Sequence, residues 1–384
     1  MHICIVYDCL FPHTVGGAER WYRNVAERLA QEGHDVTYLT LRQWERGVQA
    51  DIDARVRVVT AGPRMALYTA GGRRRIIPPL VFGVGVLVHL LRNGRRYDIV
   101  DTCAFPYFSL LAAAAVRPLA GFELVVDWFE VWSRAYWREY LGAAGGRVGE
   151  LVQRACARVP QRAFCFSELH ARRLRSEGLR GPMTVLRGLY AGSSEPPLAA
   201  PADPVVLFAG RLIPEKQVTL AVAAIALAAE RIEGLRGEIL GEGPERAALD
   251  AAIAEHGMGD AISAPGFTSS ATVEHEMGRA MCMLLTSRRE GYGMVVVEAA
   301  AHATPSVVVA GEDNAATELI AEGRNGVIAP RSDPQVIAEA IVAVHERGLA
   351  LRRSTAAWFA ENAARLSLES SLEIVLASYA SARA

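Results

Sequence analysis

The sequence has almost no net charge and no closely spaced cysteine pairs. Its 384 residues include 41 Lys and Arg against 42 Asp and Glu, which gives a net charge of −1. Proteins that bind nucleic acid usually have a basic excess, so this balance argues against that class. The six cysteines are scattered, without a Cys-x-x-Cys pair. Free, buried thiols in a reducing compartment are therefore expected.

No apolar run reaches the usual length of a membrane-spanning helix. The longest run, residues 76–91, has 16 residues and is short for a span. We expect a buried helix, with Arg73, Arg74 and Arg75 on a solvated flank. The alternative is shallow, peripheral contact with an anionic membrane face. The chain enters an apolar strand, ICIVY, almost at once, so no signal peptide and a cytoplasmic location are expected.

Length and patterning indicate two domains of α/β type. A chain of this length holds roughly two to three domains, and half of its residues are hydrophobic. Buried strands alternate with helices throughout, which is typical of doubly wound parallel sheets. The segment AGSSEPPLAAPADP, rich in Pro, Ala, Gly and Ser, is the clearest linker. The sequence predicts a first domain at residues 1–190 and a linker at residues 191–204. A second domain follows at residues 205–365, and a last helix at residues 366–384.

The stretch EGYGMVVVE contains two carboxylates, Glu290 and Glu298, with seven residues between them. Glycines and then good helix formers follow Glu290. We predict that Glu290 lies in a loop, that a helix starts near Tyr292 or Gly293, and that Glu298 lies in its second turn. Acidic residues are favoured near any helix start, so an ordinary solvated helix end is the alternative.

The first N–H groups of such a helix have no partner within the helix and can bind an anion. The two glycines would let a phosphate approach the backbone. A sugar nucleotide would then place its diphosphate at the helix start, between a hexose and a ribose. The donor contacts predicted there are Glu290, Gly291, Tyr292, Gly293, Met294 and Glu298.

A second cluster follows the strand VVLFA. Its end delivers Arg211 and Lys216 to one loop, after Gly210. Two nearby cations repel each other unless an anion lies between them. A diphosphate suits them, because Arg offers a planar fork and Lys a point charge. Glu215 would help to neutralise them in the empty state, and the alternative is an exposed strand–helix turn.

The loop after the strand at residues 124–126 is rich in aromatic residues and acids. Aromatic rings can stack on a sugar-like ligand, although they can equally cap the core. Carboxylates at the strand end could bind hydroxyls or amines of an acceptor. The predicted acceptor contacts are Asp127, Trp128, Glu130 and Trp132.

These motifs resemble the retaining glycosyltransferases of family 4. The Glu-x7-Glu pattern, the GRLIPEK block and the later GEDNAATELI block follow the family's order and spacing. The Gly16-Gly17 pair after the first strand matches less specifically. The resemblance implies the GT-B fold, in which two Rossmann-like domains face a central cleft. It also implies that the C-terminal helix returns to the N-terminal domain.

The resemblance further implies the chemistry. The donor would be a UDP-sugar, such as UDP-GlcNAc or UDP-glucose, and the acceptor a small polar molecule or a glycan. Arg211 and Lys216 would stabilise the leaving diphosphate, Glu298 would bind the ribose and Glu290 the hexose, with no metal or other cofactor. Further implied donor contacts are Gly16, Gly17, Gly210, Gly266 and Phe267.

One position departs from the family pattern. Members often have a His-Asp pair at the end of the strand at residues 124–126, where this chain has Phe129 and Glu130. Two other functions stay open, and this departure permits the second of them. One is a GT-B epimerase acting on a nucleotide sugar, and the other is a non-catalytic subunit that binds sugar nucleotides. Transfer of labelled sugar would exclude the first, and slow donor hydrolysis would argue against the second.

Overall fold

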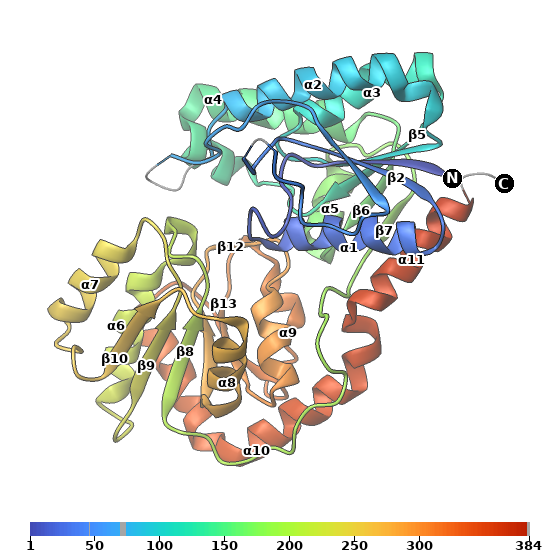
Figure 1. The fold of residues 1–384 in the computed structure, drawn as a ribbon. Coiled ribbons are helices and arrows are strands. Elements are labelled where there is room, and N and C mark those ends of the chain that lie inside the picture. Colours follow the sequence, from blue (N-terminus) through green and yellow to red (C-terminus); the bar gives the residue numbers. More distant parts are fainter. Residues whose placement is uncertain (46, 70–73, 382–384) are drawn as a thin grey trace. The chain divides into compact units, whose positions relative to one another are not determined.

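The computed structural model describes residues 1–384 except residues 46, 70–73 and 382–384. The chain divides into two compact units (Figure 1). The first contains Met1–Arg187 together with the C-terminal segment from Ser371, and the second contains Gly188–Ser370. Each unit is built around its own parallel sheet.

The first unit has a seven-stranded sheet in the order β3-β2-β1-β4-β5-β6-β7. Apolar runs such as ICIV in β1 are buried, as expected for a parallel sheet with helices on its faces. The strands are β1 His2–Val6, β2 Asp35–Thr40, β3 Val56–Thr60, β4 Ile99–Cys103, β5 Glu123–Trp128, β6 Arg162–Cys165 and β7 Met183–Val185.

Among the residues that the structure describes, six helices belong to this unit in whole or in part. Ser167 caps α5, and its Oγ accepts a hydrogen bond from the His170 N–H at 3.3 Å. In α11, the buried Tyr379 hydroxyl donates to Asp101 of β4, so the end of the chain is part of the first unit. The helices are α1 Gly17–Gln31, α2 Ile77–Asn93, α3 Phe108–Ala120, α4 Arg134–Ala157, α5 Glu168–Ser176 and α11 Leu368–Ser381, with a 3-10 turn, η1, at Gly94–Arg96.

The second unit has a six-stranded sheet in the order β10-β9-β8-β11-β13-β15. The chain starts at β8, continues to one side through β9 and β10, and then returns to place β11 on the other side. The strand order therefore reverses between β8 and β11. The strands are β8 Val205–Ala209, β9 Arg236–Leu240, β10 Ile262–Gly266, β11 Cys282–Leu285, β13 Ser306–Val309 and β15 Gly326–Ala329, and a separate small sheet pairs β12 Arg289–Glu290 with β14 Asp313–Asn314.

Helices cover this sheet as well. Val222 and Ile225 of α6 and Ile337 and Ile341 of α10 belong to one buried apolar cluster. Asp333 begins α10 by accepting a hydrogen bond from the Val336 N–H at 3.1 Å. The helices are α6 Val218–Ala229, α7 Arg246–Glu255, α8 Ser270–Arg279, α9 Met294–Ala301 and α10 Pro334–Leu366, with 3-10 turns η2 Pro214–Lys216 and η3 Ala315–Leu319.

Candidate functional site

Two loops of the second unit meet at the point where its strand order reverses. One follows β8 and the other follows β11, both at the carboxyl ends of neighbouring parallel strands. The Thr286 hydroxyl donates to the Lys216 carbonyl at 2.7 Å, and the Arg288 N–H donates to the Glu215 carbonyl at 2.9 Å. Ligands of doubly wound sheets bind at such a switch point. The two hydrogen bonds fix the relative position of the loops there.

Lys216 and Glu290 form an ion pair across these loops. Their side chains are 19% and 13% exposed, so both are largely withdrawn from water but reachable. The sequence predicted that Glu215 would neutralise Lys216 and Arg211. The structure instead places Glu290 on Lys216, while Glu215 lies 3.8 Å from the Arg289 guanidinium. The difference arises because β12 carries Glu290 back beside η2.

Arg289 is a cation of this site that the sequence did not single out. Burial lowers its pKa to about 10, while the Glu290 and Asp313 carboxylates act in the opposite direction. It therefore remains charged at neutral pH. Its signal in the sequence was the doubled arginine immediately before Glu290. Arg211, which the sequence did single out, is exposed on the loop after β8.

Helix α9 begins at this site as predicted. Gly293 caps it in the left-handed region, at φ 95°, and a Cβ there would lie 2.5 Å from the Ala316 Cβ of η3. Glycine is thus required both by the backbone conformation and by the close approach of η3. Glu298 lies half-buried in the second turn, and Glu290 precedes the helix. The predicted order of carboxylate, helix start and second carboxylate is present.

Asn314, just before η3, is a further residue that the sequence analysis did not identify. Its side-chain amide donates to the Ser287 carbonyl at 2.9 Å and the Val309 carbonyl at 2.8 Å. Its Oδ1 accepts from the Ala316 N–H at 3.0 Å. A buried amide with these partners fixes the loop after β11 to η3. No local pattern in the sequence marked it, because its partners come from three segments.

The other predicted donor contacts lie on separate loops of the second and the first unit. A Cβ at Gly210 would have Lys216 Cε as its nearest atom, at 3.9 Å, so the backbone is open there. Gly266 ends β10 at φ 92°, and Phe267 after it is 77% exposed. Gly16 and Gly17 belong to the first unit, before and at the start of α1. A Cβ at Gly16 would lie 2.3 Å from Glu19 Oε2, whereas Gly17 is open.

The predicted acceptor contacts in the first unit are mostly buried. The Asp127 carboxylate accepts from Trp21 Nε1 at 2.7 Å, and Trp128 Nε1 donates to Gln161 at 2.9 Å. Trp132 is 7% exposed and packs on neighbouring aromatic rings. The structure therefore does not support Asp127, Trp128 or Trp132 as surface contacts, because core packing accounts for them.

Glu130 differs from these three residues. Its carboxylate is half-buried and accepts from Trp132 Nε1 at 2.7 Å. Phe129, at the position where the family often has histidine, stacks on Phe166 with ring centroids 4.4 Å apart. It supplies no group that could exchange a proton. Glu130 is thus the accessible acid of this loop.

Buried carboxyls of the first unit should make its stability depend on pH. Burial raises the pKa of Asp127 to about 7, against the hydrogen bond from Trp21 Nε1, and raises that of Asp101 well above its usual range. A raised pKa in the folded state means that the neutral form stabilises the fold, so this contribution is lost as pH rises from about 4 through about 7. Asp127→Asn, which cannot ionise, should weaken that dependence.

The measurement is thermal melting of the parent, Asp127→Asn and a control variant between about pH 4.5 and pH 8. We expect the loss in Tm across this range to be smaller in Asp127→Asn by about 3 °C or more, the shift that about 1 kcal/mol produces in a domain of this size. Asp260→Asn, at an exposed position, is the control and should melt like the parent at each pH. Equal pH dependence in all three proteins would show that folding does not raise the pKa of Asp127.

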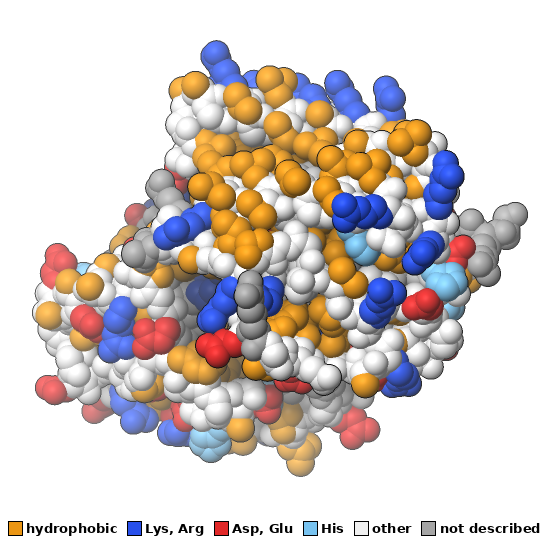
Figure 2. Space-filling model, turned by 45° about the horizontal axis from the view of Figure 1, so that its top comes forward, with side chains coloured by type: hydrophobic (Ala, Val, Ile, Leu, Met, Phe, Trp, Pro, Cys, Tyr) orange, Lys and Arg blue, Asp and Glu red, His pale blue; other side chains and the backbone are white. Residues whose placement is uncertain are grey.

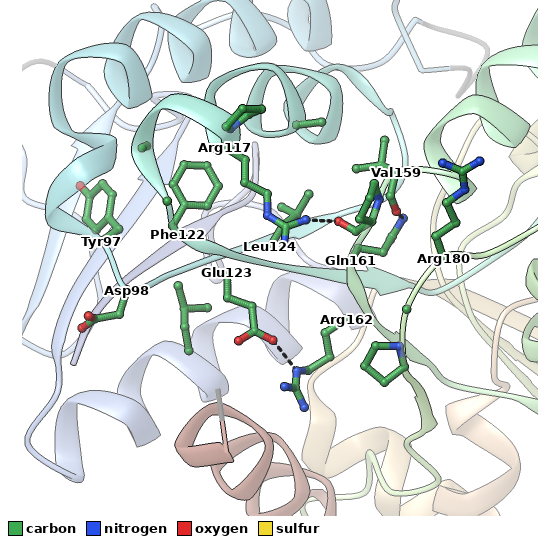
Figure 3. A pocket seen from close by; sticks show the side chains of 18 of the residues that line it. Tyr97, Asp98, Arg117, Phe122, Glu123, Leu124, Val159, Gln161, Arg162 and Arg180 are labelled. Carbon is green, nitrogen blue, oxygen red and sulfur yellow. Dashed lines mark hydrogen bonds and ion pairs between the residues drawn. The ribbon is translucent and has the colours of Figure 1, made fainter. Parts of the chain in front are cut away.

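The first unit also has a hollow at the amino ends of its strands, away from the loop that follows β5 (Figure 3). Its lining residues Asp98, Phe122 and Gln161 come just before β4, β5 and β6. An ion pair between Arg162 and Glu123, at 2.7 Å, crosses it. Because the hollow is at the amino ends of the strands, it does not have the location at which doubly wound sheets bind nucleotides.

The fold and the site define a class of protein. Two doubly wound units, one with cations and a helix start at its switch point, are features of a GT-B protein. The family model described as Glycosyltransferase Family 4 matches residues 15–187, and the model described as Glycosyl transferases group 1 matches residues 193–364. The chain therefore belongs to the family 4 (group 1) glycosyltransferases.

Individual relatives are more distant. The chain is 30% identical over 138 residues to alpha-D-kanosaminyltransferase of Streptomyces kanamyceticus. The matched stretch is 36% of this chain and 35% of that protein. It is 34% identical over 102 residues to 2-deoxystreptamine glucosyltransferase of the same organism, 27% of this chain and 26% of that one. The matched stretches thus span about a third or less of each relative.

Among solved structures, HepE of Anabaena in complex with UDP superimposes with a TM-score of 0.73 at 18% identity, covering 99% of this chain and 100% of that one. The same protein is also solved with UDP-glucose. At this identity the likeness establishes the GT-B fold of the chain.

Proposed function

We propose that the protein is a retaining hexosyltransferase. The donor is a UDP-sugar, such as UDP-GlcNAc or UDP-glucose, and the acceptor is a hydroxyl of a small polar molecule or a glycan. The observation that carries the proposal is the Lys216–Glu290 pair at the switch point of the second unit, beside the start of α9. A diphosphate at this point would meet two cations and free helix N–H groups.

The proposed mechanism depends on charge that grows on the leaving diphosphate. Lys216 and Arg211 stabilise this charge together with the first N–H groups of α9, in positions fixed before the reaction. The diphosphate competes with Glu290 for Lys216, which frees the carboxylate to accept hydrogen bonds from the hexose. Glu298 accepts from the ribose hydroxyls. The acceptor attacks the front side of the sugar, and the departing diphosphate takes its proton.

A small polar acceptor is supported by one relative and one residue. The name of the similar 2-deoxystreptamine glucosyltransferase describes such an acceptor. In this chain, Glu130 is a half-buried carboxylate at the end of β5. Glu130→Gln should raise the acceptor KM without changing donor affinity measured by calorimetry. Aminocyclitols and amino sugars are the first acceptors to assay.

The deciding experiment has two steps. A thermal-shift screen of UDP-, GDP- and ADP-sugars identifies the donor, because a ligand that binds the folded state raises Tm. The labelled donor is then incubated with acceptors, and the anomeric configuration of the product is read by NMR. Retained configuration in a transferred sugar supports the proposal. Isomerised donor without transfer indicates an epimerase, and binding without transfer or hydrolysis indicates a non-catalytic subunit.

Activity is expected to survive a chelator. Lys216, Arg211 and the α9 start supply the positive charge that a divalent cation would provide in a metal-dependent enzyme. We expect the initial rate in excess EDTA to stay within about twofold of the rate without it, since no metal ion takes part in this scheme. Loss of activity that magnesium or manganese restores would contradict metal-independent catalysis.

A further inference from the structure

Helix α2 is apolar on its outer face as well as on its inner face. Its inner residues, among them Phe82, Val86 and Leu90, are buried in the first unit. Its outer residues recur every three or four positions, which places them in one stripe along the helix. They are Ile77, Leu80, Val84, Val88 and Leu91, and their exposed fractions run from 39% to 65%.

Helix α3 lies against α2 and widens this stripe. A Cβ at Gly83 of α2 would be 2.6 Å from the Phe108 Cβ of α3, so the two helices touch. Leu111 and Leu119 of α3 are exposed and lie eight residues apart, on one side of the helix. Figure 2 shows a broad apolar area over this part of the first unit. Single exposed leucines are ordinary, whereas a continuous area of this kind marks a binding surface.

The segment that contains α2 is rich in arginine, although some of its arginines pair with acids outside it. From Ala54 to Tyr97 the sequence has nine arginines and neither aspartate nor glutamate, although the whole chain is nearly neutral. Arg75 before α2 and Arg92, Arg95 and Arg96 at its end are exposed. Figure 2 shows basic side chains along the border of the apolar area. The surface therefore combines an apolar centre with a basic rim.

Two arginines connect the end of this surface to the hollow of Figure 3. Arg95 donates to the carbonyl of the exposed Leu119 at 3.3 Å, and Arg117 lies two residues before Leu119 in α3. Both arginines line the hollow, and Figure 3 shows Arg117 there. The basic residues at this end of the surface therefore continue into the lining of the hollow.

We propose that the α2–α3 surface docks on an anionic lipid bilayer. The apolar stripe would enter the boundary between headgroups and acyl chains, and the arginines of the rim would meet the lipid phosphates. Docking needs neither donor nor acceptor, so it stands independently of the proposed reaction.

Two other arrangements fit the observations less well. Residues Ile77–Arg96 are long and apolar enough to cross a membrane by length and composition. Crossing would, however, pull the inner face of α2 out of the core of the first unit. A second copy bound through the same face would bring the two basic rims together, because a two-fold interface pairs each patch with itself. A bilayer satisfies both the apolar centre and the basic rim.

Vesicle flotation tests the proposal with the full-length protein. Vesicles of phosphatidylcholine containing about 30% phosphatidylglycerol are compared with phosphatidylcholine alone, at about 0.05 M and 0.5 M salt. We expect flotation with the anionic vesicles at low salt, weaker flotation at high salt, and little with neutral vesicles. Absence of flotation, or equal flotation with both vesicles, would overturn the proposal.

Two sets of variants locate the contact. Arg92→Gln/Arg95→Gln/Arg96→Gln should lower the partition coefficient about 100-fold, given the usual effect of each arginine near an anionic surface. Val84→Asp/Leu91→Asp should abolish flotation. The matched controls are Arg231→Gln/Arg331→Gln/Arg353→Gln and Leu198→Asp, which change exposed residues of the second unit and should float like the parent.

Further measurements keep each result decisive. Thermal melting shows whether a variant is folded, and the arginine variant decides the outcome if the aspartates destabilise α2. Light scattering without vesicles gives the molecular mass of the parent and of the aspartate variant. A parent dimer that the aspartates dissociate, together with weak flotation, would assign the surface to a second copy. Equal losses in the test and control variants would show that binding is nonspecific.

Discussion

Lys216→Ala should lower kcat about 10²–10³-fold, the effect of removing one preorganised group that stabilises transition-state charge. The donor KM should change less, because the charge on the leaving diphosphate is greatest in the transition state. Steady-state kinetics with the donor found in the screen measure both quantities. Arg331→Ala, at an exposed position of the second unit, is the control. An effect confined to KM would mean that Lys216 only binds the donor.

The sequence allows an independent test of the same residue. Lys216 is the single lysine of the chain, so an amine-reactive reagent has only one lysine side chain to modify. Its ammonium is paired with Glu290, and a bound diphosphate would cover it further. UDP should therefore slow its modification, as followed by peptide mass spectrometry with the N-terminal amine as internal reference. Equal rates with and without saturating UDP would place the nucleotide elsewhere.

Glu298→Gln should weaken donor binding by about 1.5–3 kcal/mol, the range for a hydrogen bond to a charged group. This is roughly a 10- to 150-fold rise in the Kd of the donor. Calorimetry with UDP alone tests whether the loss arises at the nucleotide, because the ribose is present in UDP and the hexose is not. Glu339→Gln, on the exposed face of α10, should bind like the parent. Unchanged UDP affinity in Glu298→Gln would remove Glu298 from the ribose site.

The matching experiment on Glu290 separates the two carboxylates. Glu290→Gln removes the ion pair with Lys216. In the proposed scheme the side chain at this position contacts only the hexose of the donor. UDP affinity should therefore be kept or improved, since the cation is no longer neutralised, while affinity for the intact UDP-sugar falls relative to UDP. A loss of UDP affinity equal to that of Glu298→Gln would mean that both carboxylates serve the nucleotide.

Several features of this protein followed from the sequence alone. Buried parallel strands appear as short, continuous apolar runs, and their alternation with helices predicted two doubly wound sheets. Glycine before a run of helix formers predicted the start of α9, because the backbone at Gly293 adopts a conformation that favours glycine. Glu290, the helix start and Glu298 lie within a few residues of one another, so their relative positions depend mainly on local backbone structure.

Other features required the tertiary structure. Lys216 and Glu290 are 74 residues apart, and only the adjacency of β8 and β11 brings them together. The sequence could not decide whether Asp127, Trp128 and Trp132 face a ligand or the core, since aromatic residues suit both places. Segments distant in the chain decided it, because Trp21, Gln153 and Gln161 supply the hydrogen-bond partners that make burial of these groups possible. The α3 helix begins only at Phe108, because Tyr107 before it has φ 71°, outside the right-handed helical region.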